Sequence, residues 1–252
     1  MSKKNKNSQQ QSFENIINLV YNDKSRKKDV FIKPRNIIQE SYLEALNNKE
    51  IDICVAAGPA GTGKTLLATL SAIKEFKNKN IKKIVVTRPN IAVDDKDIGF
   101  LPGDIMDKMA PWVRPIFDIF EDFFTYKQIT TMLKYNMLEI CPLAFVRGRT
   151  FKNSWIILDE AQGTTPNSML SVLTRIGSGS KMVVTGDIDQ SDYVQKNGLQ
   201  DFLERYNNNL KRIKIIKFTA KEVERHPVVK NVLEIYKQDT FTPPAFYGTA
   251  SV

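Results

Sequence analysis

The spacing of apolar and polar residues along the chain predicts a series of short buried strands with helices between them. Continuous apolar runs bounded by polar residues are typical of strands that are covered on both faces. These runs predict strands at 51–56, 83–87, 138–141, 154–158, 181–185 and 212–218. Helical periodicity predicts helices at about 36–46, 66–76, 111–126, 166–176, 198–206 and 228–236. The alternation predicts an α/β domain in three layers, with a mostly parallel central sheet.

The two ends of the chain lack this periodicity. Residues 1–28 are rich in Lys, Asn, Gln and Ser, and we expect them to form a basic, largely disordered tail. Residues 239–252, which contain two adjacent prolines, are expected to form a second tail. No internal repeat and no second alternating unit is found, so residues 29–238 are predicted to be one core domain.

The net charge of +9 is a weak indication of nucleic-acid binding, because much of it lies in the first tail. Residues 1–28 hold seven Lys and Arg against two acids, which leaves thirty against twenty-six in the rest of the 252 residues. A solvated basic tail accounts for this charge as well as a nucleic-acid groove does.

Cysteine and histidine usage limits the metal chemistry. Cys54 and Cys141 lie within or at the end of predicted strands and lack the spacing of a metal site. The single histidine, His226, precedes Pro227 and most simply opens the final helix. Any metal is therefore expected to be an oxygen-ligated ion such as Mg²⁺. No apolar run approaches the ~20 residues of a membrane span, and 16–20 is too short for a signal-peptide core, so a cytoplasmic location is expected.

A glycine-rich segment between the first strand and the second helix has the phosphate-loop pattern of Gly, four residues, Gly-Lys-Thr. Its backbone N–H groups at a helix N-terminus can hold a polyphosphate, and its glycines let the backbone approach the ligand closely. A glycine-rich turn without a ligand is the alternative. The expected nucleotide-binding residues of this phosphate loop are Gly58, Pro59, Ala60, Gly61, Thr62, Gly63, Lys64 and Thr65.

Polar residues follow two of the buried strands where a catalytic site would need them. Lys64 is expected to contact the β- and γ-phosphates of the nucleotide, Thr65 to ligate Mg²⁺, and Asp159 to hold this ion mostly through water. Glu160 can act as the general base that polarises the attacking water, which favours hydrolysis over transfer to an acceptor. Gln190 can contact the γ-phosphate or this water, although a polar turn after the strand is the alternative.

Arginines matter because the transition state spreads negative charge over the γ-phosphoryl oxygens. The candidates are Arg147, Arg149, Arg175 and Arg225, although for any single one of them a surface or structural role is the favoured alternative. Gln39, which precedes the first strand, can hydrogen-bond an adenine edge or can be a solvated helix residue.

Taken together, these motifs resemble the PhoH family of P-loop ATPases over about residues 31–236. Besides the phosphate loop, the similar stretches are 87–89, 99–104, 114–115, 142–150, 158–162, 173–177, 180–187 and 225–227. The chain departs from the family pattern at Gly163, where Asn is usual, at Asp189, and at 191–194, where Asp-Leu-Pro is usual. These departures flank the segment expected to sense the γ-phosphate, and they leave the coupling to a nucleic-acid partner open.

The resemblance implies a RecA-like core related to superfamily I helicases, with ATP and Mg²⁺ as cofactors. It also implies links to RNA metabolism and phosphate starvation, a tendency to form homo-oligomeric rings, with a hexamer favoured, and a frequent origin in phages. Because one RecA-like unit leaves one side of its nucleotide exposed, we expect Arg175 or Arg225 to complete a neighbouring subunit's site. Phe100, Trp112 and Arg114 can form a surface for RNA or single-stranded nucleic acid, or the aromatic rings can belong to the core.

Two classes of function therefore remain. The first is an RNA-stimulated ATPase, with helicase activity as a further expectation. The second is a nucleotide-switched regulatory or assembly ATPase that binds no nucleic acid. A kinase is a third class, disfavoured by Glu160 and by the lack of a recognisable acceptor site.

Overall fold

The computed structural model describes residues 20, 29–89, 114–190, 196–207, 210–224 and 228 of the chain. Its centre is a parallel sheet with the strand order β3-β2-β4-β5-β1-β6. The strands are β1 (Ile53–Ala57), β2 (Lys83–Arg88), β3 (Leu138–Pro142), β4 (Ser154–Leu158), β5 (Lys181–Gly186) and β6 (Ile213–Lys217). Every strand lies within two residues of its predicted bounds, because buried apolar runs bounded by polar residues mark strands sharply.

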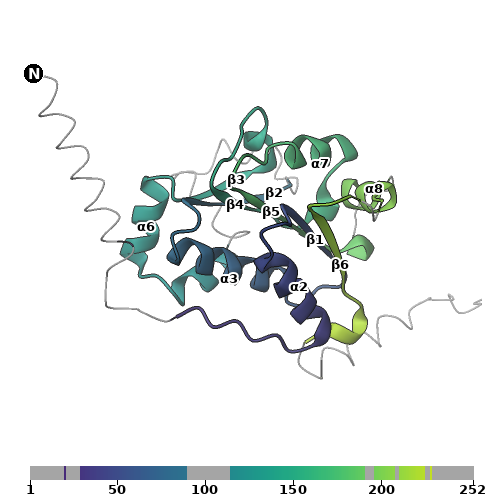
Figure 1. The fold of residues 1–252 in the computed structure, drawn as a ribbon, viewed down its shortest axis with the longest axis horizontal. Helices are drawn as coiled ribbons and strands as arrows, with labels where there is room; N and C mark the ends of the chain where they lie inside the picture. Colours follow the sequence, from purple (N-terminus) through teal and green to yellow (C-terminus); the bar gives the residue numbers. More distant parts are fainter. Residues whose placement is uncertain are drawn as a thin grey trace, which may run out of the picture.

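Helices cover both faces of this sheet, as Figure 1 shows. On one side lie α2 and α3, and on the other α7 and α8. The α-helices are α2 (Ile37–Asn47), α3 (Lys64–Lys77), α6 (Tyr126–Lys134), α7 (Pro166–Leu173) and α8 (Gly198–Arg205). The predicted three-layer α/β fold with a RecA-like core is confirmed, since β5 lies between the strand that precedes the phosphate loop and the strand that precedes Asp159.

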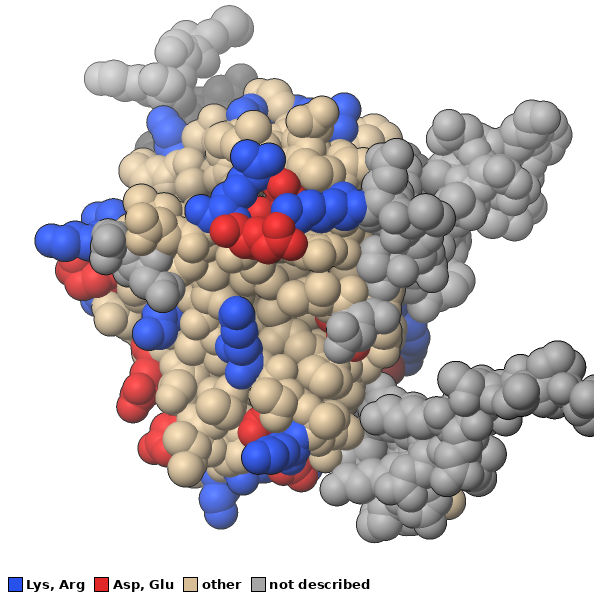
Figure 2. All heavy atoms as spheres, turned by 90° about the vertical axis from the view of Figure 1, so that its right-hand side faces the viewer, with Lys and Arg blue, Asp and Glu red and all other residues tan. Residues whose placement is uncertain are grey.

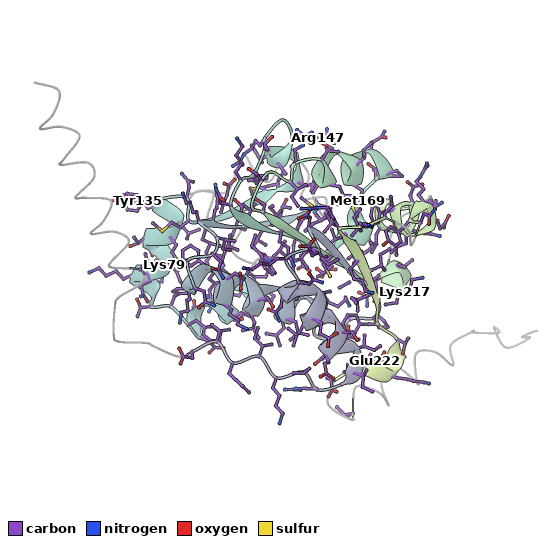
Figure 3. All side chains as sticks on the ribbon, in the orientation of Figure 1. Lys79, Tyr135, Arg147, Met169, Lys217 and Glu222 are labelled. Atoms are coloured by element: carbon purple, nitrogen blue, oxygen red, sulfur yellow. The ribbon has the colours of Figure 1, made fainter. Side chains whose placement is uncertain are left out.

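Two hydrophobic cores form because successive strand residues point to opposite faces of the sheet. In β1, Cys54 and Ala56 face the core that contains α2 and α3, whereas Val55 and Ala57 face the core of α7 and α8. Met169 of α7 is directed toward the sheet in the second core, while Arg147 lies at the outer surface on the same side (Figure 3). Both faces of the sheet are thus covered, and polar chemistry is confined to its edges and strand ends.

The structure differs from the predicted helices in two main places. The helix predicted at 111–126 is interrupted, since residues 114–121 are helical and α6 begins separately at Tyr126. Thr125 and Gln128 cap α6 reciprocally, with the Gln128 side chain accepting from the Thr125 N–H at 2.7 Å. This pair starts a new helix. Helix α7 ends at Leu173, where Thr174 is the C-cap and its N–H donates to the Leu170 carbonyl at 3.2 Å.

Other expectations have mixed outcomes. Helical spacing within 36–46 predicts Ile37 on the buried face, but this first residue of α2 is 76% exposed. Val20 is the one described residue of the first predicted tail, and it is buried in the core. The rest of both predicted tails lies outside the described residues, as do Phe100, Trp112, the segment 225–227 and nearly all of the predicted last helix. Among the helices that are described, none has the length and apolar character that crossing a membrane requires.

Charged side chains form mixed groups on the side of the molecule where α8 and β6 lie. Figure 2 looks onto this side and shows blue and red residues close together, with uncharged surface between the groups. Helix α8 follows this pattern, since Arg205 pairs with Asp201 at 2.7 Å and Lys196 pairs with Glu204. The visible part of this face therefore offers no continuous basic surface among the described residues.

Candidate nucleotide site

The phosphate loop connects the carboxyl end of β1 to the first turn of α3, as its pattern requires. Gly58 has a φ of +145°, and a Cβ at this position would lie 2.3 Å from the Phe218 carbonyl oxygen, so the position accepts only glycine. Gly63 is left-handed, with a φ of +82°, and places no capping side chain on α3. The first N–H groups of this helix are therefore directed at the adjoining pocket, where they favour a bound anion.

Residues from distant parts of the chain hold the phosphate loop in place. The Gln39 side-chain amide donates to the Thr62 carbonyl at 3.1 Å, and its oxygen accepts from the Arg35 N–H at 2.9 Å. The N–H of Glu224 donates to the Gly61 carbonyl at 3.0 Å. Gln39 is only 4% exposed, so the alternative of a solvated helix residue is wrong, and its amide supports the loop from α2.

Lys64 lies folded back over the phosphate loop. Its ammonium group donates to the carbonyls of Gly58 and Pro59 at 2.6 and 2.7 Å, and its side chain is largely buried. The Tyr42 hydroxyl donates to the Lys64 carbonyl at 3.4 Å, and burial raises the pKa of Tyr42 well above its usual value, so this donor stays protonated. The lysine is thereby held at the edge of the pocket in which a phosphate would be bound.

Asp159 is surrounded by four hydrogen-bond donors. Its Oδ1 accepts from the hydroxyls of Thr65 at 2.7 Å and Thr185 at 2.6 Å. Its Oδ2 accepts from Nε of Arg88 at 2.8 Å and also from Nη2 of this guanidinium. A threonine hydroxyl and a carboxylate are the hard oxygen ligands that Mg²⁺ prefers, so the adjacent Thr65 and Asp159 fit this ion.

Glu160 adopts a left-handed backbone conformation, with φ 55° and ψ 44°. This conformation costs a non-glycine residue of the order of 1 kcal/mol. Its Oε2 accepts from Nε2 of Gln162 at 2.7 Å, and Oε1 of Gln162 accepts from the Asp187 N–H at 3.0 Å. Asp187 in turn accepts from the N–H of Ala60 at 3.1 Å. A chain of hydrogen bonds thus connects Glu160 to the phosphate loop.

These groups line one pocket of about 330 Å³ at the carboxyl ends of the strands. Its lining brings together Lys64, Thr65, Asp159, Glu160 and Gln190, which come from the ends of three different strands or the segments that follow them. Gln190 belongs to a short 3-10 turn, Ile188–Gln190, after β5. The lining residues Ala60, Gly61, Gly63, Leu66, Arg88, Pro115, Gly186 and Asp187 complete it.

Of the arginines singled out from the sequence, Arg147, Arg149 and Arg175 do not line this pocket. Arg149 forms an ion pair with Glu139 and stacks on Phe151, with its guanidinium carbon 4.7 Å from the ring centre. Arg147 is exposed and donates to the Ser168 hydroxyl at 3.2 Å. Arg175 follows α7, near the amino ends of the strands, where its backbone carbonyl accepts from Phe151. Arg225 lies outside the described residues.

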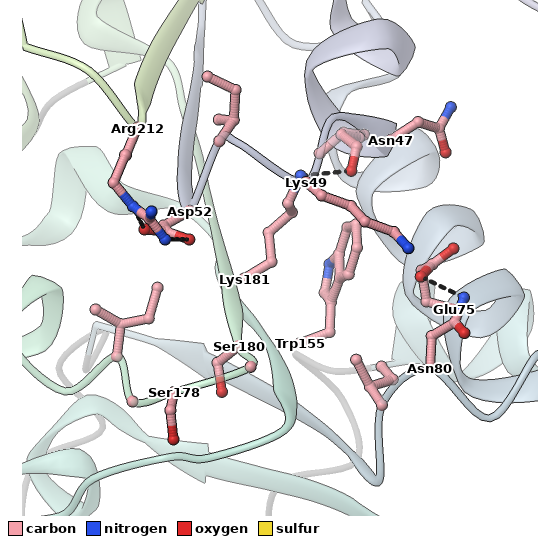
Figure 4. Close-up of a pocket in the computed structure, with 16 residues that line it drawn as sticks. Asn47, Lys49, Asp52, Glu75, Asn80, Trp155, Ser178, Ser180, Lys181 and Arg212 are labelled. Carbon is pink, nitrogen blue, oxygen red and sulfur yellow. Dashed lines mark hydrogen bonds and ion pairs between the residues drawn. The ribbon is translucent and has the colours of Figure 1, made fainter.

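A larger cavity of about 650 Å³ lies at the opposite, amino-terminal edge of the sheet (Figure 4). Lys181 extends along Trp155 there, and its ammonium donates to the carbonyls of Ala45, Leu46 and Asn48 at 3.0, 2.6 and 2.8 Å. Burial lowers the pKa of Lys181. Because the Lys181 ammonium already binds the carbonyls at the C-terminal end of α2, it is not available to hold a phosphate in this cavity. The larger volume of the cavity therefore does not make it a phosphate site.

Three residues of the site were not singled out from the sequence: Arg88, Thr185 and Gln162. Arg88 ends β2 and Thr185 lies in β5, so each reaches Asp159 only because its strand is a close neighbour of β4 in the sheet. The signal for Arg88 was a basic residue at the end of a buried strand. Its meaning depends on the strand order, which the sequence does not give.

Comparison with known proteins points to one family. A family model described as "PhoH-like protein" matches residues 31–237. The PhoH-like protein of Synechocystis sp. is 37% identical over 223 residues, which cover 88% of this chain and 66% of that protein. The PhoH-like protein of Bacillus subtilis is 40% identical over 207 residues, which cover 81% of this chain and 64% of that protein. The chain therefore spans slightly less than two thirds of the length of these relatives.

Among solved structures, the DUF1998 helicase MrfA bound to DNA is similar at 12% identity and a TM-score of 0.44, over 81% of this chain and 27% of that one. The assignment to a family rests instead on the family model and on the sequence identity to the relatives over most of this chain. The phosphate loop, Asp159 and Glu160 all lie within the matched residues. The chain belongs to the PhoH-like protein family.

Proposed function

We propose that this chain is a Mg²⁺-dependent ATP hydrolase whose activity is stimulated by single-stranded RNA. The observation that carries the proposal is the 2.7 Å contact between the Thr65 hydroxyl and Asp159, beside the phosphate loop and directly before Glu160. A phosphate cradle, two metal ligands and a carboxylate base in one pocket are the parts that phosphoryl transfer to water requires.

Each residue has a distinct task in this reaction. The N–H groups at the start of α3 and the ammonium of Lys64 bind the phosphate oxygens. Thr65 and Asp159 would hold Mg²⁺, which neutralises charge that develops on those oxygens. Glu160 accepts the proton of the attacking water. Gln162 fixes the position of the Glu160 carboxylate, since its amide donates to Oε2.

A surface next to α7 supports a nucleic-acid partner. It combines Phe145 and Leu170, which are 67% and 63% exposed, with the exposed Arg147, whose guanidinium donates to the Ser168 hydroxyl of α7. Residues 140–158 and 161–186 contain no Asp or Glu, so this part of the chain suits a polyanion. Exposed aromatic rings beside arginines bind single strands by stacking and charge.

Of the surface expected from the sequence (Phe100, Trp112 and Arg114), only Arg114 is described. This arginine is less suited to binding nucleic acid. Its guanidinium pairs with Asp118 at 2.7 Å and with Glu121 at 3.3 Å. Two acids close to an exposed arginine reduce its attraction for a phosphate. We therefore assign the nucleic-acid contact to Phe145 and Arg147.

The test is ATP turnover of the wild type, Lys64→Ala and Glu160→Gln, with and without single-stranded RNA. We expect Lys64→Ala to lose ATP binding, and Glu160→Gln to bind ATP but to turn it over roughly 10³-fold more slowly, because the general base is removed. Stimulation by RNA should fall as salt rises, since phosphate contacts release counterions. An inactive wild type under all conditions would contradict the proposal.

The RNA part has its own matched variants. Phe145→Ala is expected to weaken stimulation by RNA about tenfold, because each stacked base contributes ~1–3 kcal/mol. Tyr126→Ala removes another exposed ring, 81% exposed on α6, and should leave stimulation unchanged. Equal turnover with and without RNA would instead favour the second function, a nucleotide-switched regulatory or assembly ATPase.

A further inference from the structure

Arg88 occupies a position in the pocket that the proposed reaction does not yet use. It is the last residue of β2, and the Asp159 N–H donates to the carbonyl of the preceding Thr87 at 3.0 Å. This register places the guanidinium beside the Asp159 carboxylate. The ion pair is well shielded from water, since the side chains of Arg88 and Asp159 are 11% and 3% exposed.

The same carboxylate is the expected ligand of the divalent cation. In the structure, two donors of Arg88 engage Oδ2, while Thr65 and Thr185 engage Oδ1. A guanidinium and a divalent cation on one buried carboxylate repel each other, and the repulsion is strong where water is excluded. Arg88 and the cation therefore compete for Asp159.

Two further carboxylates line the described part of this pocket, and each already accepts a hydrogen bond from another group. Of the remaining carboxylates in its lining, Glu160 accepts from Gln162, and Asp187 accepts from the Ala60 N–H. The phosphate loop, which would hold a polyphosphate, lines the same pocket as Arg88. An arginine binds phosphoryl oxygens well, because its planar group carries several donors.

We propose that Arg88 has two alternative partners in the working site. One is Asp159, as in the structure, and the other is the terminal phosphoryl group of a bound nucleoside triphosphate when a divalent cation takes Asp159. Arg88 thereby restrains the metal ligand until the nucleotide arrives, and then stabilises the transferring phosphoryl group from within its own subunit. This inference rests on the proposed ATPase function.

The test compares Arg88→Gln with the wild type in two binding measurements that do not depend on turnover. The first is Mn²⁺ binding without nucleotide, followed by the electron paramagnetic resonance signal of free Mn²⁺. We expect Arg88→Gln to bind Mn²⁺ about tenfold more tightly, because the competing cation is gone. The Mn²⁺ affinity of Arg88→Lys should lie between those of the wild type and Arg88→Gln.

The second measurement titrates fluorescent ADP and a non-hydrolysable ATP analogue in the presence of Mg²⁺. Arg88→Gln should lower the affinity for the triphosphate analogue about tenfold or more, which is the typical effect of losing a charged hydrogen bond. Binding of ADP should change by less than about twofold, because ADP lacks the terminal phosphoryl group. Arg205→Gln, an exposed arginine paired with Asp201 on α8, should leave both affinities unchanged.

Two outcomes would overturn the inference. If Arg88→Gln weakens ADP and the triphosphate equally, or leaves Mn²⁺ binding unchanged, then Arg88 only supports the position of Asp159. Should Arg88→Gln fail to fold by circular dichroism, Arg88→Lys carries the same comparison with smaller expected shifts. If the wild type binds no ATP, the proposed function itself fails. If the wild type binds ATP and the Arg88 variants have the same affinities as the wild type, only the role of Arg88 is disproved.

Discussion

At the scale of single residues, Gln162 joins two parts of the site through one side-chain amide. Its Nε2 donates to Glu160 at 2.7 Å, and its Oε1 accepts from the Asp187 N–H at 3.0 Å. The backbone of Glu160 is held in an unusual left-handed conformation, and the hydrogen bond from Gln162 restrains its carboxylate. Gln162 is therefore a positioning residue for the expected general base.

We expect Gln162→Ala to lower the kcat for ATP about 10- to 100-fold while the affinity for ATP changes little. The reason is that Glu160 loses the donor that fixes it, whereas the phosphate loop keeps its own contacts. Steady-state turnover and nucleotide titration measure the two effects separately. Gln200→Ala is the control, since Gln200 donates to Glu204 on the exposed side of α8. A proportional loss of affinity would show that Gln162 supports the loop instead.

The residues of the site differed in how well the sequence could predict them. Lys64, Thr65, Asp159 and Glu160 stand at fixed spacings after predicted strands, and the structure brings these four into one pocket. Arg88 escaped prediction because its partner is set by strand order. Gln39 also depended on tertiary packing, since only the approach of α2 brings its amide to the phosphate loop.

At the scale of elements, β3 forms an edge of the described sheet and carries part of a half-buried charge cluster. Glu139 of β3 pairs with Lys83 at 2.5 Å and accepts from Nη2 of Arg149 at 2.8 Å. The hydrogen bond from Arg149 and the nearby Lys83 hold the pKa of Glu139 at about 2, well below its ordinary value. The cluster joins β3 to β2 and to the segment before β4.

Replacing Glu139 with Gln should lower the free energy of unfolding by about 1–3 kcal/mol near pH 7, because two cations lose a charged acceptor. The folded pKa lies below the unfolded value of about 4.3. The contribution of Glu139 is therefore complete above about pH 5 and is lost as the pH falls toward 2. Urea denaturation at pH 7 and pH 3 measures the change, and the gap between variant and wild type should shrink at pH 3. A constant gap would exclude this linkage.

Helices were predicted less precisely than strands, because their ends depend on local hydrogen bonds. The break before α6 arises from the reciprocal cap between Thr125 and Gln128. Its Thr-x-x-Gln pattern is visible in the sequence, but Phe117, Phe120 and Phe124 at helical spacing favoured one longer helix. Side-chain caps thus outweighed the apolar period at this position.

At the scale of the whole molecule, the nucleotide pocket opens at the carboxyl edge of the sheet and Arg175 lies near the amino edge. Nε of Arg175 is buried, and no acceptor lies opposite it within the described part of the chain. An arginine on the edge opposite its own pocket can reach a nucleotide only in another subunit. We therefore retain the proposal of a ring in which Arg175 or Arg225 completes the neighbouring site.

Mixing two inactive variants tests this assembly. Arg175→Gln subunits keep Glu160, and Glu160→Gln subunits keep Arg175. A site in a mixed ring is complete where an Arg175→Gln subunit receives the arginine of a Glu160→Gln neighbour. Random mixing into a closed ring should restore roughly a quarter of wild-type turnover. Native mass spectrometry would verify that mixed oligomers form. If mixed oligomers form but ATP turnover does not recover, Arg175 does not complete the neighbouring site. The same experiment with Arg225→Gln in place of Arg175→Gln then tests Arg225.

Several segments far apart in sequence are attached to the phosphate loop: Gln39 from α2, Asp187 after β5, and Glu224 after β6. Disorder in the loop would release all of these attachments, so we expect its order to be lost only together with that of the surrounding domain. A ligand that binds the ordered loop then stabilises the folded state as a whole. If the pocket binds ATP as proposed, the nucleotide also acts as a folding ligand, and we expect the protein's resistance to heat and proteolysis to rise with the nucleotide concentration.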